Sequence, residues 1–164
     1  MTTSIANSKI VGIRALKAAI DRLKGEGKRV VFTNGCFDVL HRGHVKLLSD
    51  AKRFGDILVV GLNSDSSVRK IKGKSRPIRS QRERAAILAS LAAVDFVTIF
   101  HEPTPLEVIK TLVPDVLVKG GDWRKDSIVG ARFVESRGGR VVRVPLLKGY
   151  STTSLIRRIK KSYG

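Results

Sequence analysis

The chain has 164 residues, of which 42% are hydrophobic, and this is enough to bury the core of one domain of ordinary size. No run approaches the roughly 20 apolar residues of a membrane span, and the polar start, Met1 to Lys9, lacks the apolar stretch of a secretory signal. We therefore expect a cytoplasmic location without a membrane partner. The single cysteine, Cys36, excludes an internal disulfide and a cysteine zinc set.

The net charge of +18 indicates attraction to polyanions. The partner could be nucleic acid, an acidic membrane surface or a phosphate-rich substrate; the alternative is that the charge is only a solvated basic surface.

Along the chain, apolar residues at helical spacing predict a helix over 13–23. A short β-branched run at 29–33 predicts a buried strand, and the apolar pattern predicts a second helix from His44 and a second buried strand at 57–62. The segment 69–84 has eight basic residues and one acid, and we expect a loop there.

Ser80 and Glu83 form a capping box that opens the next helix, and Thr104 and Glu107 form another, with Pro105 at the first helical position. Three short apolar runs predict three further strands: 96–100, 116–118 and 140–144. Two more helices are expected, at 130–136 and 151–160, the last with Leu155, Ile156 and Ile159 facing inward. Alternation of strands and helices predicts an α/β fold, a doubly wound, five-stranded parallel sheet.

Two histidines follow the first strand at the point where a parallel sheet binds ligands. In His41-Arg42-Gly43-His44, Gly43 allows the backbone to approach a ligand closely, and both imidazoles can donate hydrogen bonds to phosphate oxygens. The alternatives are a zinc site or a structural capping pair, and zinc lacks a complete ligand set in the sequence. A P-loop is excluded because Val68 stands where its first glycine is required. The dinucleotide-binding motif G-x-G-x-x-G does not occur either.

The motif Gly35-Cys36-Phe37-Asp38 leading into His41-Arg42-Gly43-His44, with Ser151-Thr152-Thr153 near the end, resembles the cytidylyltransferase-like nucleotidyltransferase superfamily. The resemblance covers Lys28 to Ile159. Within the superfamily, the chain is most similar to D-glycero-D-manno-heptose 1-phosphate adenylyltransferases, on three motifs in the same order. These motifs are Thr33-Asn34-Gly35-Cys36-Phe37-Asp38, Val118-Lys119-Gly120-Gly121-Asp122 and Ser151-Thr152-Thr153.

The resemblance implies a Rossmann-like nucleotidyltransferase fold in one domain, 1–164, with a helical lead-in at 1–27 and a catalytic core at 28–164. It implies transfer of an adenylyl group from ATP to a heptose 1-phosphate, which gives ADP-heptose and pyrophosphate for bacterial lipopolysaccharide or capsule precursors. Mg²⁺ would arrive with ATP, bridged mainly by phosphate oxygens, and no metal site of the protein's own is expected. We expect a homodimer that stands alone, without the kinase to which some relatives are fused.

Two alternative functions stay open. One is a cytidylyltransferase for a small alcohol phosphate such as glycerol 3-phosphate. Relatives of that kind have an arginine just ahead of the last motif, where this chain has Leu146, Leu147 and Lys148, so Lys148 is only a minor candidate ligand. The other is a basic nucleic-acid-binding module, which 5% aromatic content and the absence of recognition motifs disfavour.

The resemblance also implies roles for individual residues. His41 and His44 would hold the triphosphate and stabilise the transition state, and Lys72 and Lys74 would be mobile catalytic lysines, with Lys70 as a substitute. Asp38 would face the acceptor, orient the strand-end loop or cap a helix. Cys36 is interpreted as a small packing residue rather than a nucleophile. The expected nucleotide-binding residues are Asn34, Gly35, Cys36, Phe37, Gly43, Arg84, Gly121, Asp122, Trp123, Ser151, Thr152 and Thr153.

Overall fold

The computed structural model describes residues 8–121, 124, 127–147 and 149–163. Its centre is one parallel sheet with the strand order β3-β2-β1-β4-β5. The strands are β1 (Val30–Gly35), β2 (Ile57–Asn63), β3 (Phe96–Phe100), β4 (Val116–Gly120) and β5 (Arg140–Val144). This confirms the predicted fold class, although β1 continues two residues beyond the predicted strand.

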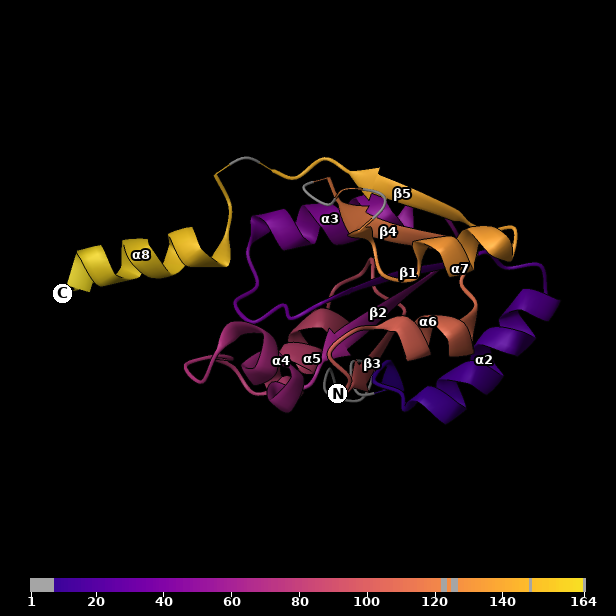
Figure 1. Cartoon of the computed structure of the whole chain (residues 1–164), viewed down its shortest axis with the longest axis horizontal. Helices are drawn as coiled ribbons and strands as arrows, with labels where there is room; N and C mark the ends of the chain where they lie inside the picture. Colours follow the sequence, from indigo (N-terminus) through magenta and orange to yellow (C-terminus); the bar gives the residue numbers. More distant parts are fainter. Residues whose placement is uncertain (1–7, 122–123, 125–126, 148, 164) are drawn as a thin grey trace.

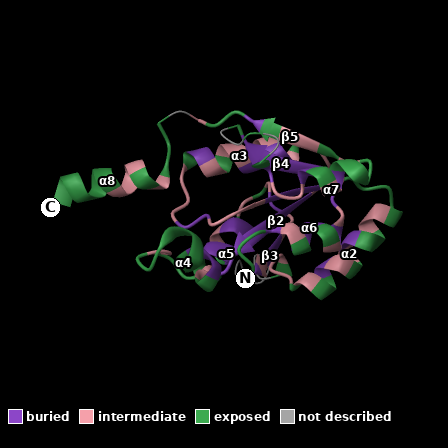
Figure 2. Cartoon of the chain, in the orientation of Figure 1, coloured by how far each residue is buried: buried purple, intermediate pink, exposed green. Residues whose placement is uncertain are grey.

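Helices cover both faces of the sheet (Figure 1). The helices are α2 (Ile13–Gly25), α3 (Arg42–Lys52), α4 (Asp65–Lys72), α5 (Gln81–Ala89), α6 (Leu106–Leu112), α7 (Ala131–Ser136) and α8 (Thr152–Tyr163). Side chains of α2, α6 and α7 share one apolar cluster with Phe32, and side chains of α3 and α5 share the other with Val31. Adjacent residues of β1 thus point into opposite clusters, as a strand buried on both faces requires. Figure 2 shows the buried residues concentrated between the layers.

The N-terminal helical lead-in belongs to this layered structure. Leu16 and Ile20 of α2 are fully buried against the sheet. Ahead of the helix, Ile10 forms a parallel bridge with Val97, and Lys9 donates a hydrogen bond to the carbonyl of Val94 over 2.7 Å. The lead-in therefore helps to cover the face of the sheet opposite α3 and α5.

Three local predictions were wrong. The first residues of the segment 69–84, predicted as a loop, belong to α4, because Ser64 caps that helix and Val68 anchors it in the core. Helix α6 has Pro105 as its N-cap and no side-chain capping bond, so the predicted capping box of Thr104 and Glu107 does not form. The capping box of Ser80 and Glu83 does form.

The third difference concerns α8. This helix extends away from the body of the molecule (Figure 1), and none of its residues is buried. Ile159, predicted to face inward, is 50% exposed. An amphipathic pattern predicts which residues share a helix face, but it does not predict what that face contacts. Within the described residues, no helix is long and apolar enough to cross a membrane.

Candidate active site

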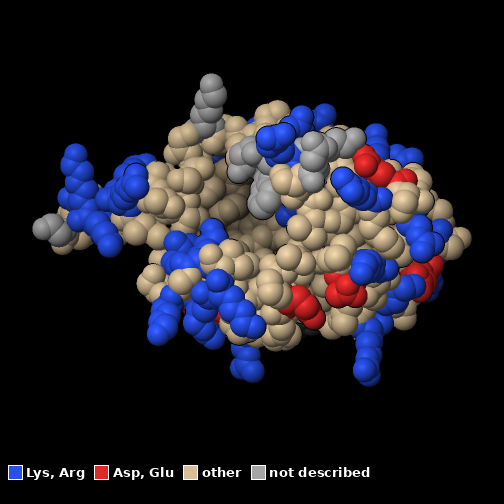
Figure 3. Space-filling model, in the orientation of Figure 1, with Lys and Arg blue, Asp and Glu red and all other residues tan. Residues whose placement is uncertain are grey.

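A cavity of about 590 Å³ lies at the carboxyl ends of β1 and β4. These strands flank the point where the chain order reverses, which is where open α/β sheets bind ligands. The walls come from the β1–α3 turn, the end of α4, residues 103–105 after β3, the end of β4, and residues 146–147 and 150–153. Figure 3 shows this hollow, with Lys and Arg side chains gathered beside it over α4 and along α8.

The turn after β1 has a strained backbone that positions the histidines. Phe37 has a φ of 44°, a left-handed conformation that is uncommon for a residue with a side chain. Its ring lies so close to Gly35 that a Cβ there would be 3.0 Å from the ring edge. The same ring contacts His44 edge-on, with the ring centroids 5.2 Å apart. The glycine therefore makes room for Phe37, and Phe37 supports the imidazole.

His41 and His44 are stacked, with their ring centroids 3.8 Å apart. Nδ1 of His41 accepts a hydrogen bond from the backbone N–H of Gly43 at 3.1 Å, and Nδ1 of His44 accepts one from the N–H of His41 at 3.4 Å. An imidazole nitrogen that accepts a hydrogen bond carries no proton, so each neutral ring carries its proton on Nε2. The capping and phosphate-binding interpretations are thus compatible, because Nδ1 caps α3 and Nε2–H is a donor.

The local electrostatics hold both rings neutral. Burial, with smaller contributions from His41 and Lys72, lowers the pKa of His44 from 6.5 to about 4. Burial also lowers the pKa of His41. At neutral pH the pair therefore offers hydrogen-bond donors without positive charge, and the cations of the site come from other residues.

Among the residues that the structure describes, three cationic side chains line the cavity: Lys72, Arg76 and Lys119. Lys72 was predicted here, whereas Lys74 is exposed and lies outside the lining. Lys119 is only 8% exposed, and its ammonium donates hydrogen bonds to Asn34 Oδ1 at 2.5 Å and to the Asn34 carbonyl at 3.4 Å. Lys119 belongs to one of the three motifs that carry the family resemblance, but no role was predicted for it. Its position at the end of the strand beside β1 was the available signal.

Asp38 holds residues 76–79 of the lysine- and arginine-rich segment 69–84 in place. Its carboxylate accepts hydrogen bonds from the backbone N–H groups of Ile78 at 2.7 Å and Arg79 at 3.0 Å, and it forms an ion pair with Arg76. Burial raises the pKa of Asp38, but the bonds from Arg79, Ile78 and Arg76 outweigh it, so the net pKa is lowered. Of the roles considered for Asp38, the structure shows the orientation of a loop, and acceptor binding stays a prediction.

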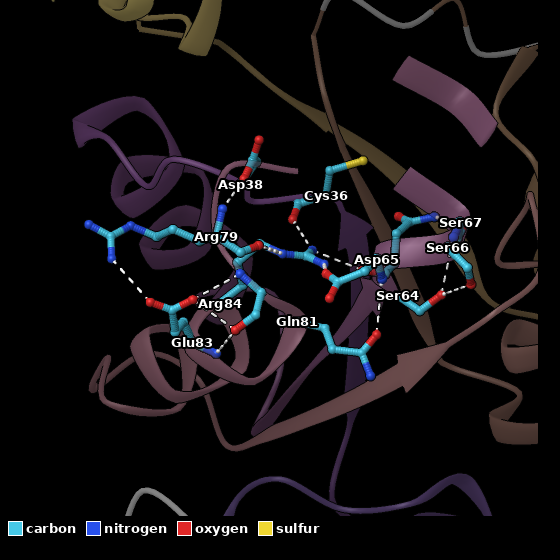
Figure 4. Close-up of polar contacts among 12 residues, drawn as sticks. Cys36, Asp38, Ser64, Asp65, Ser66, Ser67, Arg79, Gln81, Glu83 and Arg84 are labelled. Atoms are coloured by element: carbon cyan, nitrogen blue, oxygen red, sulfur yellow. Dashed lines mark hydrogen bonds and ion pairs between the residues drawn. The ribbon is translucent and has the colours of Figure 1, made fainter. Parts of the chain in front are cut away.

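Arg84 does not point into the cavity, contrary to the sequence-based expectation. It is 1% exposed and lies beneath the turn after β1 (Figure 4). Its guanidinium donates to the carbonyls of Cys36 at 2.5 Å, Asn63 at 2.9 Å and Arg79 at 3.0 Å, and it forms an ion pair with Asp65 at 2.7 Å. Arg84 therefore joins the ends of β1 and β2 to α4.

Cys36 is positioned by the same turn. Burial raises the pKa of its thiol, and the nearby charges of Lys72 and Arg84 offset this only in part. A thiol held in its protonated form is a poor nucleophile. The pKa direction therefore supports the interpretation of Cys36 as a packing residue.

The last predicted motif reaches the cavity from the start of α8. Ser151, Thr152 and Thr153 all line it, and Ser151 Oγ accepts a hydrogen bond from the N–H of Ser154 at 3.1 Å. Gly121 lies next to the lining residue Gly120, and its N–H donates to the Val144 carbonyl at 2.8 Å.

The remaining predicted ligands Asp122 and Trp123, and the minor candidate Lys148, lie outside the described residues. Lining residues for which no role in the site was predicted include Asn63, Arg76, Thr104, Val129 and Tyr150. They come from five separate segments that only the folded chain brings together.

Residues 32–158 match the family described as cytidylyltransferase-like, and the chain belongs to this family. Its sequence is 54% identical over 158 residues to the bifunctional protein HldE of Geobacter sulfurreducens, and 53% identical over 161 residues to that of Geobacter metallireducens. These alignments cover 96% and 98% of this chain, but only 32% and 33% of the relatives. The chain thus spans about a third of the length of the curated relatives it matches.

Two solved structures have a similar fold. The lipopolysaccharide core biosynthesis protein from Thermoplasma volcanium is 32% identical with a TM-score of 0.62, over 76% of this chain and 100% of that one. The pantoate-beta-alanine ligase from Francisella tularensis has a TM-score of 0.63 at 17% identity, over 92% of this chain and 76% of that one, and it shows likeness of fold alone. These findings confirm the family and the fold that the motifs predicted.

Proposed function

We propose that this protein is an adenylyltransferase that joins ATP and a heptose 1-phosphate to give ADP-heptose and pyrophosphate. The relatives at 53–54% identity are named bifunctional, and a chain that spans about a third of them corresponds to part of that activity. The observation that carries the proposal is the stacked pair His41 and His44, whose Nε2–H groups are available as donors at the sheet's ligand-binding edge. Nucleotidyl transfer requires such donors for phosphate oxygens.

In this reaction an oxygen of the sugar phosphate attacks the α-phosphorus of ATP. A new P–O bond forms while the bond to the oxygen that bridges the α- and β-phosphorus atoms breaks, and pyrophosphate leaves with that electron pair. No covalent bond to the protein is needed, so the protein contributes positioning and charge stabilisation. His41 and His44 donate hydrogen bonds to the reacting phosphate, and Lys72 and Lys119 offset the charge that develops on the leaving group.

Mg²⁺ enters this scheme with the nucleotide. Among the described residues, no group of three or more His, Cys, Asp or Glu side chains could hold a metal ion. The phosphate oxygens are the hard ligands that this ion prefers, and they would hold it in this proposal.

The test incubates the protein with Mg²⁺, each of the four nucleoside triphosphates and a panel of sugar and alcohol phosphates. Released pyrophosphate and the nucleotide product are measured. We expect pyrophosphate and ADP-heptose with ATP and a heptose 1-phosphate. Product only with CTP and glycerol 3-phosphate would support the alternative cytidylyltransferase. No pyrophosphate with any pair would contradict an enzymatic function and favour the nucleic-acid-binding alternative.

The homodimer and the cytoplasmic location belong to the same proposal. Light scattering after gel filtration tests the first, with a mass near twice 18.0 kDa expected. Fractionation of cells that produce the protein tests the second.

A further inference from the structure

Tyr150 is the most exposed of the rings that line the described part of the cavity. Its exposed fraction is 44%, whereas that of the lining residue Phe37 is 6%. Tyrosine is enriched at binding surfaces, and an aromatic face in a binding cavity suits a flat, unsaturated ligand.

The position of this ring is defined by the turn that holds the histidines. A Cβ on Gly43 would be 3.3 Å from Cβ of Tyr150, so only glycine at 43 allows the two segments to come this close without a shift. The guanidinium carbon of Arg42 lies 6.0 Å from the centroid of the tyrosine ring. Tyr150 thus contacts the start of α3, next to both imidazoles.

The surroundings of Tyr150 suit a nucleobase better than a phosphate. Among the described residues, five aliphatic side chains line the same cavity: Leu47, Ile71, Val129, Leu146 and Leu147. Ser151 follows Tyr150 directly and opens the phosphate-facing start of α8. A base linked through its ribose to a phosphate at the histidine pair must lie within one sugar of that pair. Among the described lining residues, Phe37 and Tyr150 have aromatic rings near this place, but Phe37 is buried against Gly35 and His44, so Tyr150 has the accessible ring.

We propose that the ring of Tyr150 stacks on the base of the bound nucleotide, and that this contact favours a purine over a pyrimidine. The inference rests on the proposed function, because it places the base of ATP in the same cavity. A purine presents the larger π-face, and Arg42 beside the ring adds a cation–π contribution to the stack. Tyr150 is thus a specificity-determining residue for the nucleotide, not for the sugar.

The experiment measures the binding of ATP, CTP and inorganic tripolyphosphate to the full chain by calorimetry, without any acceptor. The variants are Tyr150→Ala and Tyr150→Phe, and the matched control is Tyr163→Ala at the far end of α8, where the ring is 90% exposed. We expect Tyr150→Ala to weaken ATP binding by about 5-fold to about 150-fold, the range for one base stacked on an aromatic ring. CTP should be weakened less, and tripolyphosphate not at all.

Tyr150→Phe keeps the aromatic face and should bind ATP about as tightly as the unmodified chain, as should Tyr163→Ala. Unchanged ATP binding in Tyr150→Ala would overturn the inference. Equal weakening of ATP and tripolyphosphate would also overturn it, because Tyr150 would then act on the phosphate cradle. Since no sugar phosphate is present, failure of the heptose reaction would leave a positive binding result standing, whereas a chain that binds no nucleotide would overturn both proposals.

Discussion

Replacing Arg84 by methionine tests whether this buried side chain holds the site together. The variant removes an ion pair to Asp65 and the hydrogen bonds to the carbonyls of Cys36, Asn63 and Arg79. The guanidinium side chain is fully buried, and the Asp65 side chain is 25% exposed. Methionine is shorter than arginine but close to it in volume, so the change removes the charge and the donors while it keeps most of the volume.

The expected magnitude follows from these contacts. Removing one partner of a buried ion pair costs about 3–5 kcal/mol, because the other charge and its acceptors lose their compensation. Water reaches part of Asp65, which places the expected loss of unfolding free energy toward the lower end, about 3 kcal/mol. In a domain of this size each kcal/mol lowers Tm by about 2–4 °C, so Tm should fall by about 6–12 °C.

The assay is urea unfolding monitored by circular dichroism, with thermal melting as a second measurement. Arg82→Met is the matched control, because Arg82 belongs to the same helix and is exposed. We expect Arg82→Met to lie within about 0.5 kcal/mol of the unmodified chain. A loss below about 1 kcal/mol in Arg84→Met would refute the reasoning that this side chain joins β1, β2 and α4.

Three further predictions concern the histidine pair. His44→Ala should lower turnover by about 10²-fold or more, since it removes a donor to the reacting phosphate. The far-ultraviolet circular dichroism spectrum should stay unchanged, and near-normal turnover would contradict the role of His44. Gly43→Ala should lower turnover because the new Cβ would be 3.0 Å from the His41 ring. Gly12→Ala is the control, because there is open space around Gly12, and it should not lower turnover. Equal activity of the two variants would contradict this prediction and show that the His41 ring moves to make room. The lowered pKa of His44 means that the unfolded chain binds the proton more readily, so unfolding free energy should fall as pH drops from about 6.5 to about 4. His44→Gln should make that slope shallower, and an unchanged slope would argue against the buried neutral ring.

Local patterns in the sequence were sufficient for the strands and for the histidine turn. Val30 and Val31 are β-branched and bounded by turn residues, and they are fully buried in the central strand. The capping box at Ser80 and Glu83 formed between residues three apart in the chain, whereas the same spacing at Thr104 and Glu107 did not give one, because α6 begins after Pro105. Predictions of this kind depend on neighbours that the sequence itself displays.

Predictions failed where a residue's role depends on a distant segment. Arg84 has the same local signals whether it points into the site or beneath it, and the carbonyls of Cys36 and Asn63 decide its direction. The apolar face of α8 was predicted to be inward, but the pattern contains no information about what lies opposite.

The sequence by itself determined the doubly wound sheet, the order of its motifs and the two imidazoles at the end of the first strand. These follow from periodicity and turn chemistry, which act over a few residues. Only the tertiary structure decided that Asp38 and Arg84 are held by protein groups, and that Lys119 and Tyr150 line the cavity. The physical reason is that burial and hydrogen-bond partners arise from packing between segments far apart in the chain.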